Sequence, residues 1–82
     1  MIDETKAIKA QQILDNPEEV YGLNRAYIML TDTSMTMSFS SLMDAVNIMH
    51  DAGWEINNMT SYGSYMFVMM KNTNYKKKHG AL

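Results

Sequence analysis

The side chains of this sequence that could do chemistry do not form a catalytic or metal-binding pattern. The 82 residues include two histidines and no cysteine, so disulfides and thiolate metal sites are excluded. A zinc site needs three or four ligands at workable spacing, and His50 beside Asp51 does not supply them. No nucleophile elbow, phosphate-binding loop or zinc-protease signature is present. We therefore expect no catalytic residues, no metal and no cofactor.

Glu55 is the carboxylate best suited to acid–base chemistry, because the neighbouring Trp54 could remove it from water. The alternative is that the two residues alternate along a strand, with Trp54 in the core and Glu55 in solvent. An enzyme is accordingly a weaker interpretation than either of the two functional hypotheses given at the end of this subsection.

Ten methionines are the most unusual feature of the composition. Two pairs, Met35 with Met37 and Met69 with Met70, could be thioether ligands for copper(I). Adjacent residues of a regular strand point to opposite faces, however, so Met69 and Met70 cannot share an ion. Flexible thioethers also make adaptable contact surfaces. We favour partner binding and core filling over copper.

The aromatic residues are the strongest indication of function. Tyrosine and tryptophan are favoured at interfaces because they combine a large area with a polar group, although Trp54 and Phe67 are equally suited to a core. The residues that we expect to contact a partner or ligand are Tyr27, Met29, Trp54, Tyr62, Tyr65 and Phe67, with Arg25 and Lys71 as the nearby cations.

The charge distribution argues against nucleic acid as a partner. The formal net charge is -2, and residues 26–70 contain no lysine or arginine. Nucleic-acid binding needs cations matched to phosphates. The first ten residues are acidic and polar rather than basic and then apolar, and no apolar run approaches the roughly 20 residues of a membrane span. We expect a cytoplasmic protein with no membrane association.

The apolar pattern predicts a small α+β domain with an antiparallel sheet of three to four strands. Helical spacing predicts a helix over residues 42–52, which Gly53 ends, and an additional N-terminal helix over residues 3–14. Strands are predicted over residues 25–31, 34–39, 54–56 and 65–71, with a polar turn over 57–64. The core order is β-β-α-β-β, with one helix packed across the sheet.

The sequence divides into an N-terminal helix and connector (1–24), the α+β core (25–72) and a mobile basic tail (73–82). The first and last core strands are apolar on both faces, whereas one helix covers only one face. Large exposed apolar patches are rare in monomers. Either the N-terminal helix or a second copy of the chain must cover the other face, and we favour the second copy.

The helix end and the last strand resemble an uncharacterised family of small bacterial domains. Its members carry a helix ending in a pattern like L-N-x-L-G-x-x-G-W-E, followed by a strand rich in Tyr and Phe that ends in Lys or Arg. The matching residues here are Val46, Met49, Gly53, Trp54, Glu55, Tyr65, Met66, Phe67 and Lys71. His50 replaces the first glycine of the pattern. The resemblance implies a small α+β fold and no known activity.

Two functional hypotheses follow from these observations. The first is a non-catalytic interaction module that forms a homodimer or higher oligomer and binds another protein, as a phage-type inhibitor or accessory factor would. The alternative is a protein that sequesters a small ligand, such as a nucleotide, in an aromatic pocket at a subunit interface lined by Tyr62, Tyr65 and Trp54. In that case Arg25 and Lys71 would be the only groups near enough to meet a phosphate.

Overall fold

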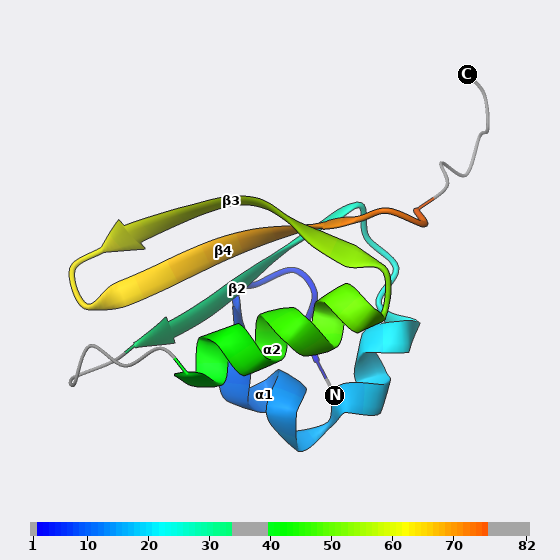
Figure 1. Cartoon of the computed structure of the whole chain (residues 1–82), viewed down its shortest axis with the longest axis horizontal. Coiled ribbons are helices and arrows are strands. Elements are labelled where there is room, and N and C mark those ends of the chain that lie inside the picture. Colours follow the sequence, from blue (N-terminus) through cyan, green and yellow to red (C-terminus); the bar gives the residue numbers. More distant parts are fainter. Residues whose placement is uncertain (1, 34–39, 76–82) are drawn as a thin grey trace.

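The computed structural model describes residues 2–33 and 40–75, which form two layers, a sheet and the helices packed on one of its faces (Figure 1). In chain order the elements are β1 (Ile8–Lys9), α1 (Ala10–Asp15), the 3-10 helix η1 (Pro17–Gly22), β2 (Tyr27–Thr33), α2 (Ser40–Asp51), β3 (Trp54–Tyr62) and β4 (Tyr65–Asn72). The predicted α+β class is confirmed. In the described part of the chain, no helix combines the length and apolar character that a membrane span requires.

The sheet is mixed, so the prediction of a purely antiparallel sheet is wrong. Its strand order is β1-β2-β4-β3. The pairs β2–β4 and β4–β3 are antiparallel, whereas β1 runs parallel to β2 and places Ile8 beside Leu30. The chain order therefore begins with a strand that the β-β-α-β-β prediction did not contain. The strand predicted over residues 34–39 lies outside the described residues.

The N-terminal helix is shorter than predicted, because residues 3–5 form a side-chain turn and Ile8–Lys9 form strand β1. The Asp3 carboxylate accepts hydrogen bonds from the Thr5 backbone N–H at 3.0 Å and from the Thr5 hydroxyl at 2.6 Å. Such a side-chain turn competes with helix formation. Ile8 then enters the sheet and is 1% exposed, a burial that a helix starting at Asp3 would not give it.

The core lies between the sheet and the helices. The predicted apolar face of α2 is confirmed, since Leu42, Ala45, Val46 and Met49 are all buried. Helix α1 packs on the same side as α2 and adds Ala10 and Ile13 to the same cluster. The sheet contributes Ile8, Ile28, Leu30, Trp54, Val68 and Met70. The interpretation of Trp54 as a core residue is confirmed by its 2% exposure.

Gly53 turns the chain from α2 into β3, as the sequence predicts. Its φ of 98° lies in the left-handed region, which costs a side-chain-bearing residue about 1 kcal/mol or more. Its carbonyl accepts hydrogen bonds from the backbone N–H and the hydroxyl of Thr73. A Cβ at this position would collide with the side-chain amide of Asn74. Residues that follow β4 thus close the corner between α2 and β3.

The predicted polar turn over residues 57–64 is mostly strand. Strand β3 continues to Tyr62, and only Gly63 and Ser64 connect it to β4. Gly63 has a φ of 61°, which a two-residue hairpin turn requires. Every β3 residue after Trp54 is exposed, because the end of the hairpin projects past α2 (Figure 1). The segment is polar because water reaches both of its faces.

Candidate functional site

One face of the sheet has no helix over it among the described residues. The buried side chains of β2 and β4 alternate, with Ile28, Leu30, Val68 and Met70 on the helix side. The residues between them point to the opposite side. We call that side the open face, and it consists of Lys9 of β1, of Tyr27, Met29 and Thr31 of β2, of Tyr65, Phe67, Met69 and Lys71 of β4, and of Glu55, Asn58, Thr60 and Tyr62 of β3.

The strand register arranges the open face in four rows that run across the strands. A shift between Ile56 and Asn58 in β3 sets which residues of the hairpin share a row. The rows are the charged row Tyr27-Lys71-Glu55, the methionine row Met29-Met69-Asn58, the phenylalanine row Lys9-Thr31-Phe67-Thr60 and the tyrosine row Tyr65-Tyr62.

The open face is aromatic and rich in thioether. Tyr27 is 48% exposed and Tyr65 is 47% exposed, and Phe67 and Met69 are half-buried. The rings of Tyr65 and Phe67 stack with centroids 6.2 Å apart. The side-chain amide of Asn57 donates to the Met69 sulfur at 3.8 Å. These side chains offer a large apolar area with polar groups at its margin, which is the composition of a protein contact surface.

Thr31 is the one buried polar side chain of the described residues, at 8% exposure. It stands between Lys9 of β1 and Phe67 of β4 in the sheet, and its hydroxyl has no hydrogen-bond partner among residues 2–33 and 40–75. A buried hydroxyl without a partner costs roughly 1–3 kcal/mol. The hydroxyl therefore lowers the stability of the sheet beneath the open face.

Most of the residues singled out from the sequence come together on the open face. Tyr27, Met29, Tyr62, Tyr65, Phe67 and Lys71 all belong to it. Trp54 does not, because it lies in the core. Trp54 pairs with Asn72 and Tyr62 pairs with Tyr65, at opposite ends of the hairpin. Within one chain the predicted trio of Tyr62, Tyr65 and Trp54 is thus not a pocket.

The sequence reasoning missed the contribution of β3 to this surface. Asn58 and Thr60 join the open face because of the register shift after Ile56. A bulge of this kind inserts an extra residue and reverses the alternation that follows it. The polar sequence gave no sign of a bulge, although the glycine at position 63 is compatible with a tight hairpin turn.

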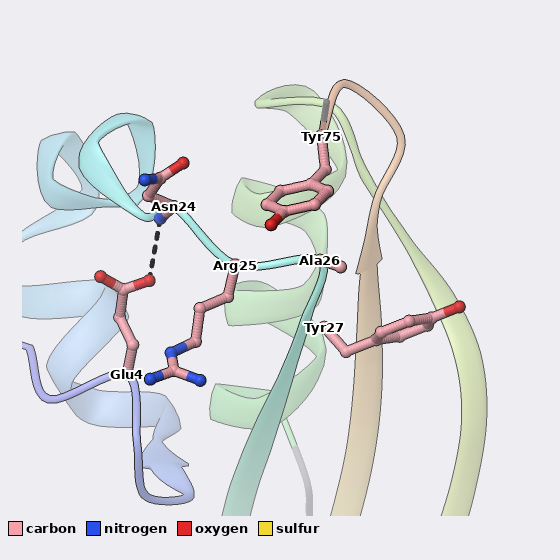
Figure 2. A pocket seen from close by; sticks show the side chains of 6 residues that line it. All are labelled: Glu4, Asn24, Arg25, Ala26, Tyr27 and Tyr75. Atoms are coloured by element: carbon pink, nitrogen blue, oxygen red, sulfur yellow. Dashed lines mark hydrogen bonds between the residues drawn. The ribbon is translucent and has the colours of Figure 1, made fainter. Parts of the chain in front are cut away.

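Arg25 lies outside the open face, in a shallow hollow at one end of the sheet. The hollow has a volume of about 610 Å³ and is lined by Glu4, Asn24, Arg25, Ala26, Tyr27 and Tyr75. Figure 2 shows Arg25 on the Glu4 side of the hollow, while Tyr27 points away from Arg25. The Glu4 carboxylate accepts a hydrogen bond from the backbone N–H of Asn24 at 2.8 Å (Figure 2). A cation (Arg25), an anion (Glu4) and two aromatic rings (Tyr27 and Tyr75) thus line the same hollow.

Asp3 borders a second, smaller hollow beside the first, which also includes Arg25. The hydrogen bond from the Thr5 hydroxyl, together with that from the Thr5 backbone N–H, lowers the pKa of the Asp3 carboxyl below its usual value of 3.8. Lys6 and Arg25 lower it further through their charge. Asp3 therefore stays ionised near neutral pH and keeps a negative charge next to Arg25.

Other residues considered for chemistry do not gather into a site. Glu55 is exposed, as the alternation with Trp54 indicates. Residues 2–33 and 40–75 contain no cluster of three acidic or histidine side chains that could hold a metal ion. Met35 and Met37 lie outside the described residues, while Met69 and Met70 point to opposite faces of β4.

Comparison with known proteins identifies no relative of the chain: no protein family, curated protein or solved structure matches it. The resemblance to a family of small bacterial domains stays a prediction. The functional argument therefore rests on the open face and the Arg25 hollow alone.

Proposed function

We propose that the chain is a non-catalytic interaction module that self-associates through the open face and, as an oligomer, binds another protein. One observation supports this most strongly: Tyr27, Met29, Phe67, Tyr65 and Met69 share a sheet face over which no described helix lies. Apolar patches of a few hundred Å² on a monomer are often functional. In the same interpretation the module works in the cytoplasm, since it has no cysteine that an oxidising compartment would pair.

The size of the open face sets the strength of the expected dimer. Three strands about 4.8 Å apart, over the seven residues of β2, give a projected area of about 14 by 23 Å. Protruding side chains make the accessible area larger, so the face falls at the low end of specific interfaces, about 600 Å² per copy. We expect a dissociation constant in the micromolar range, about 1 to 100 µM.

Sedimentation equilibrium from about 1 µM to 1 mM would test self-association. We expect a monomer of 9.4 kDa at the lowest concentrations and a species of twice that mass at the highest. Replacing Met69 by Asp should weaken the dimer at least about 10-fold, because it places a charge in the apolar middle of the contact surface.

The matched control is the Tyr21→Asp variant. Tyr21 is 74% exposed, but it belongs to η1 and not to the open face. This variant should dimerise as the wild type does. A monomer at every concentration, or equal weakening by both variants, would rule out the open face as the interface.

The Arg25 hollow supports a second function, capture of a small anionic ligand with a ring, such as a nucleotide. The hollow holds a guanidinium and two tyrosine rings at its rim, which suit a phosphate and a base, while Glu4 on the same rim and Asp3 beside it weaken the attraction for an anion. A nucleoside monophosphate at 100 times its dissociation constant should add about 2.7 kcal/mol of stability. The corresponding rise in melting temperature should disappear in Arg25→Ala. No rise in the wild type, or an equal rise in the variant, would exclude this function.

A further inference from the structure

The open face is polar at one end and aromatic at the other. The charged row places Lys71 of β4 between Tyr27 of β2 and Glu55 of β3. The opposite end carries Tyr65 and Tyr62, and Tyr62 is 80% exposed. The methionine and phenylalanine rows lie between these ends. A surface with such polarity cannot pair with its own copy equally well in every orientation.

Two face-to-face arrangements are possible for a symmetric dimer centred on β4, the middle strand of the open face. If the two-fold axis runs along the strands, each row faces the same row of the other copy. If the axis runs across the strands, the strands of the two copies are antiparallel and the order of the rows is reversed. The two arrangements bury the same surface and differ in which rows and strands meet, since the first places β2 over β3 and the second places each strand over its own copy.

We propose that two copies stack with their strands antiparallel, so that the charged row of each lies over the tyrosine row of the other. This proposal rests on self-association through the open face. Lys71 then faces the ring of the partner's Tyr65, a cation–π contact. Glu55 faces the partner's Tyr62, whose hydroxyl can donate a hydrogen bond to the carboxylate. Lys71 and Glu55 thereby each gain a favourable neighbour.

The inner rows are also complementary in this orientation. Met69 lies over the partner's Phe67, and a thioether beside an aromatic ring is a favourable contact. Asn58 lies over the partner's Thr60, so that amide and hydroxyl can form a hydrogen bond. The side chains that are half-buried in one copy therefore meet groups of matching chemistry.

The other orientation is disfavoured by charge. It places Lys71 opposite the partner's Lys71, and like charges placed opposite each other destabilise a contact. It places Glu55 over the partner's Tyr27 rather than over Tyr62, so the contact that separates the two arrangements is the one that Lys71 makes. Since the two arrangements otherwise bury the same residues, this repulsion selects the antiparallel one.

The usual crossing angle of packed sheets does not remove the contact. Stacked sheets cross at about 30°, and the end rows lie about 10 Å from the axis. The end rows are then displaced sideways by about 5 Å, which is one strand spacing. When the displacement is toward β3, Lys71 moves from the partner's Tyr65 to the partner's Tyr62 on the neighbouring strand and still meets a phenol ring.

Cysteine cross-linking distinguishes the two orientations, because the natural sequence has no cysteine. Two single variants, Lys71→Cys and Tyr65→Cys, are compared alone and as a mixture in which one carries a size tag, using a short bismaleimide at a concentration where the wild type is dimeric. We expect cross-linked dimer in the mixture and not in either variant alone. Positions 71 and 65 are about 20 Å apart along β4, so identical positions of antiparallel copies are too distant to join.

The mixture is also the least perturbed sample, because one Lys71–Tyr65 contact survives in each mixed dimer. Tyr21→Cys, mixed with either variant, should give no cross-link. The antiparallel orientation would be overturned if each variant cross-links to itself and no cross-link joins the tagged chain to the untagged one in the mixture. That result would leave self-association through the open face intact. No cross-link in any sample, with sedimentation showing a dimer of the wild type, would overturn both proposals.

Discussion

The two faces of the central strands carry almost the same kinds of residue, and the helices cover only one of them. On β4, Val68 and Met70 are fully buried under α2, whereas Phe67 and Met69 on the open face are half-buried. On β2, Leu30 is fully buried while Tyr27 is half exposed. Apolar character alone therefore does not tell which face of a strand forms the core.

Because of this difference, the covered face should contribute to the folding stability of one chain and the open face to the association of two chains. Burial under the helices removes apolar area from water within one chain, worth about 25 cal/mol per Å². The same chemistry on the open face gains that energy only when a second molecule covers it. Substitutions on the covered face should change folding, and those on the open face should change self-association.

Adjacent methionines of β4 give the sharpest and largest test of this contrast. Met70 is fully buried, so Met70→Ala should lower the free energy of unfolding by roughly 2–5 kcal/mol through lost burial and a cavity. Met69→Ala on the open face should cost less than about 1 kcal/mol in the monomer. Urea unfolding followed by the fluorescence of Trp54, at a concentration where the dimer has dissociated, measures both. Equal losses would show that the two faces are equally buried.

Gly53→Ala should have the next largest effect, because it disturbs the corner that leads α2 into β3. The variant combines a φ of 98° with a collision at Asn74, and we expect a loss of more than about 1 kcal/mol. Gly63→Ala is the matched control, since its φ is also positive but nothing lies within 4 Å of the added Cβ. If thermal unfolding shows the same loss of stability for both variants, the contact with Asn74 does not contribute to the cost of Gly53→Ala.

Thr31→Val is a substitution in the sheet that we expect to stabilise the fold, unlike the two preceding substitutions. Valine has the same shape as threonine but lacks the hydroxyl that has no partner here. Removing that hydroxyl should raise the free energy of unfolding by about 1 kcal/mol. The urea midpoint of the variant should therefore move upward, and a downward shift would mean that the hydroxyl is hydrogen-bonded in solution.

The smallest expected effect is the acid sensitivity of the Asp3 turn, on the helix side of the sheet. The pKa of Asp3 is lowered below 3.8 in the folded chain, so its stabilising contribution is fully present above pH 3.8 and is lost as the pH falls through the folded-state value. NMR titration of the Asp3 carboxyl carbon should show the lowered pKa. In Thr5→Val, which lacks the hydroxyl donor, the pKa should move back toward 3.8, and an unchanged value would contradict the assigned cause.

The sequence was sufficient to predict two elements that form the covered side of the fold, helix α2 and strand β4. The spacing of Leu42, Ala45, Val46 and Met49 predicts the buried face of α2, and Gly53 marks its end. The alternation along residues 65–71 also predicts β4 with apolar side chains on both faces. These signals are local, so they can be read from a single strand or helix turn.

The features that the sequence did not predict depend on contacts between distant residues. Ile8 became a strand residue because it pairs with Leu30, and nothing within residues 3–14 contains that information. The composition of the candidate site was partly predictable, since Tyr27, Met29, Tyr65 and Phe67 share one apolar alternation. Its rows were not, because the bulge after Ile56 decides which residues of β3 stand beside Met69 and Phe67.

The central claim is that copies of the chain meet at the open face, and the methionine methyl groups report on it directly. They can be followed by NMR in a dilution series from about 1 mM to 1 µM. Met29 and Met69 lie on the open face, whereas Met49 and Met70 lie in the core. We predict that the first pair of methyl signals shifts with concentration and the second pair does not. Shifts confined instead to Met43 and Met59, which are exposed on the other side of the sheet, would contradict the claim, as would signals that do not move at all.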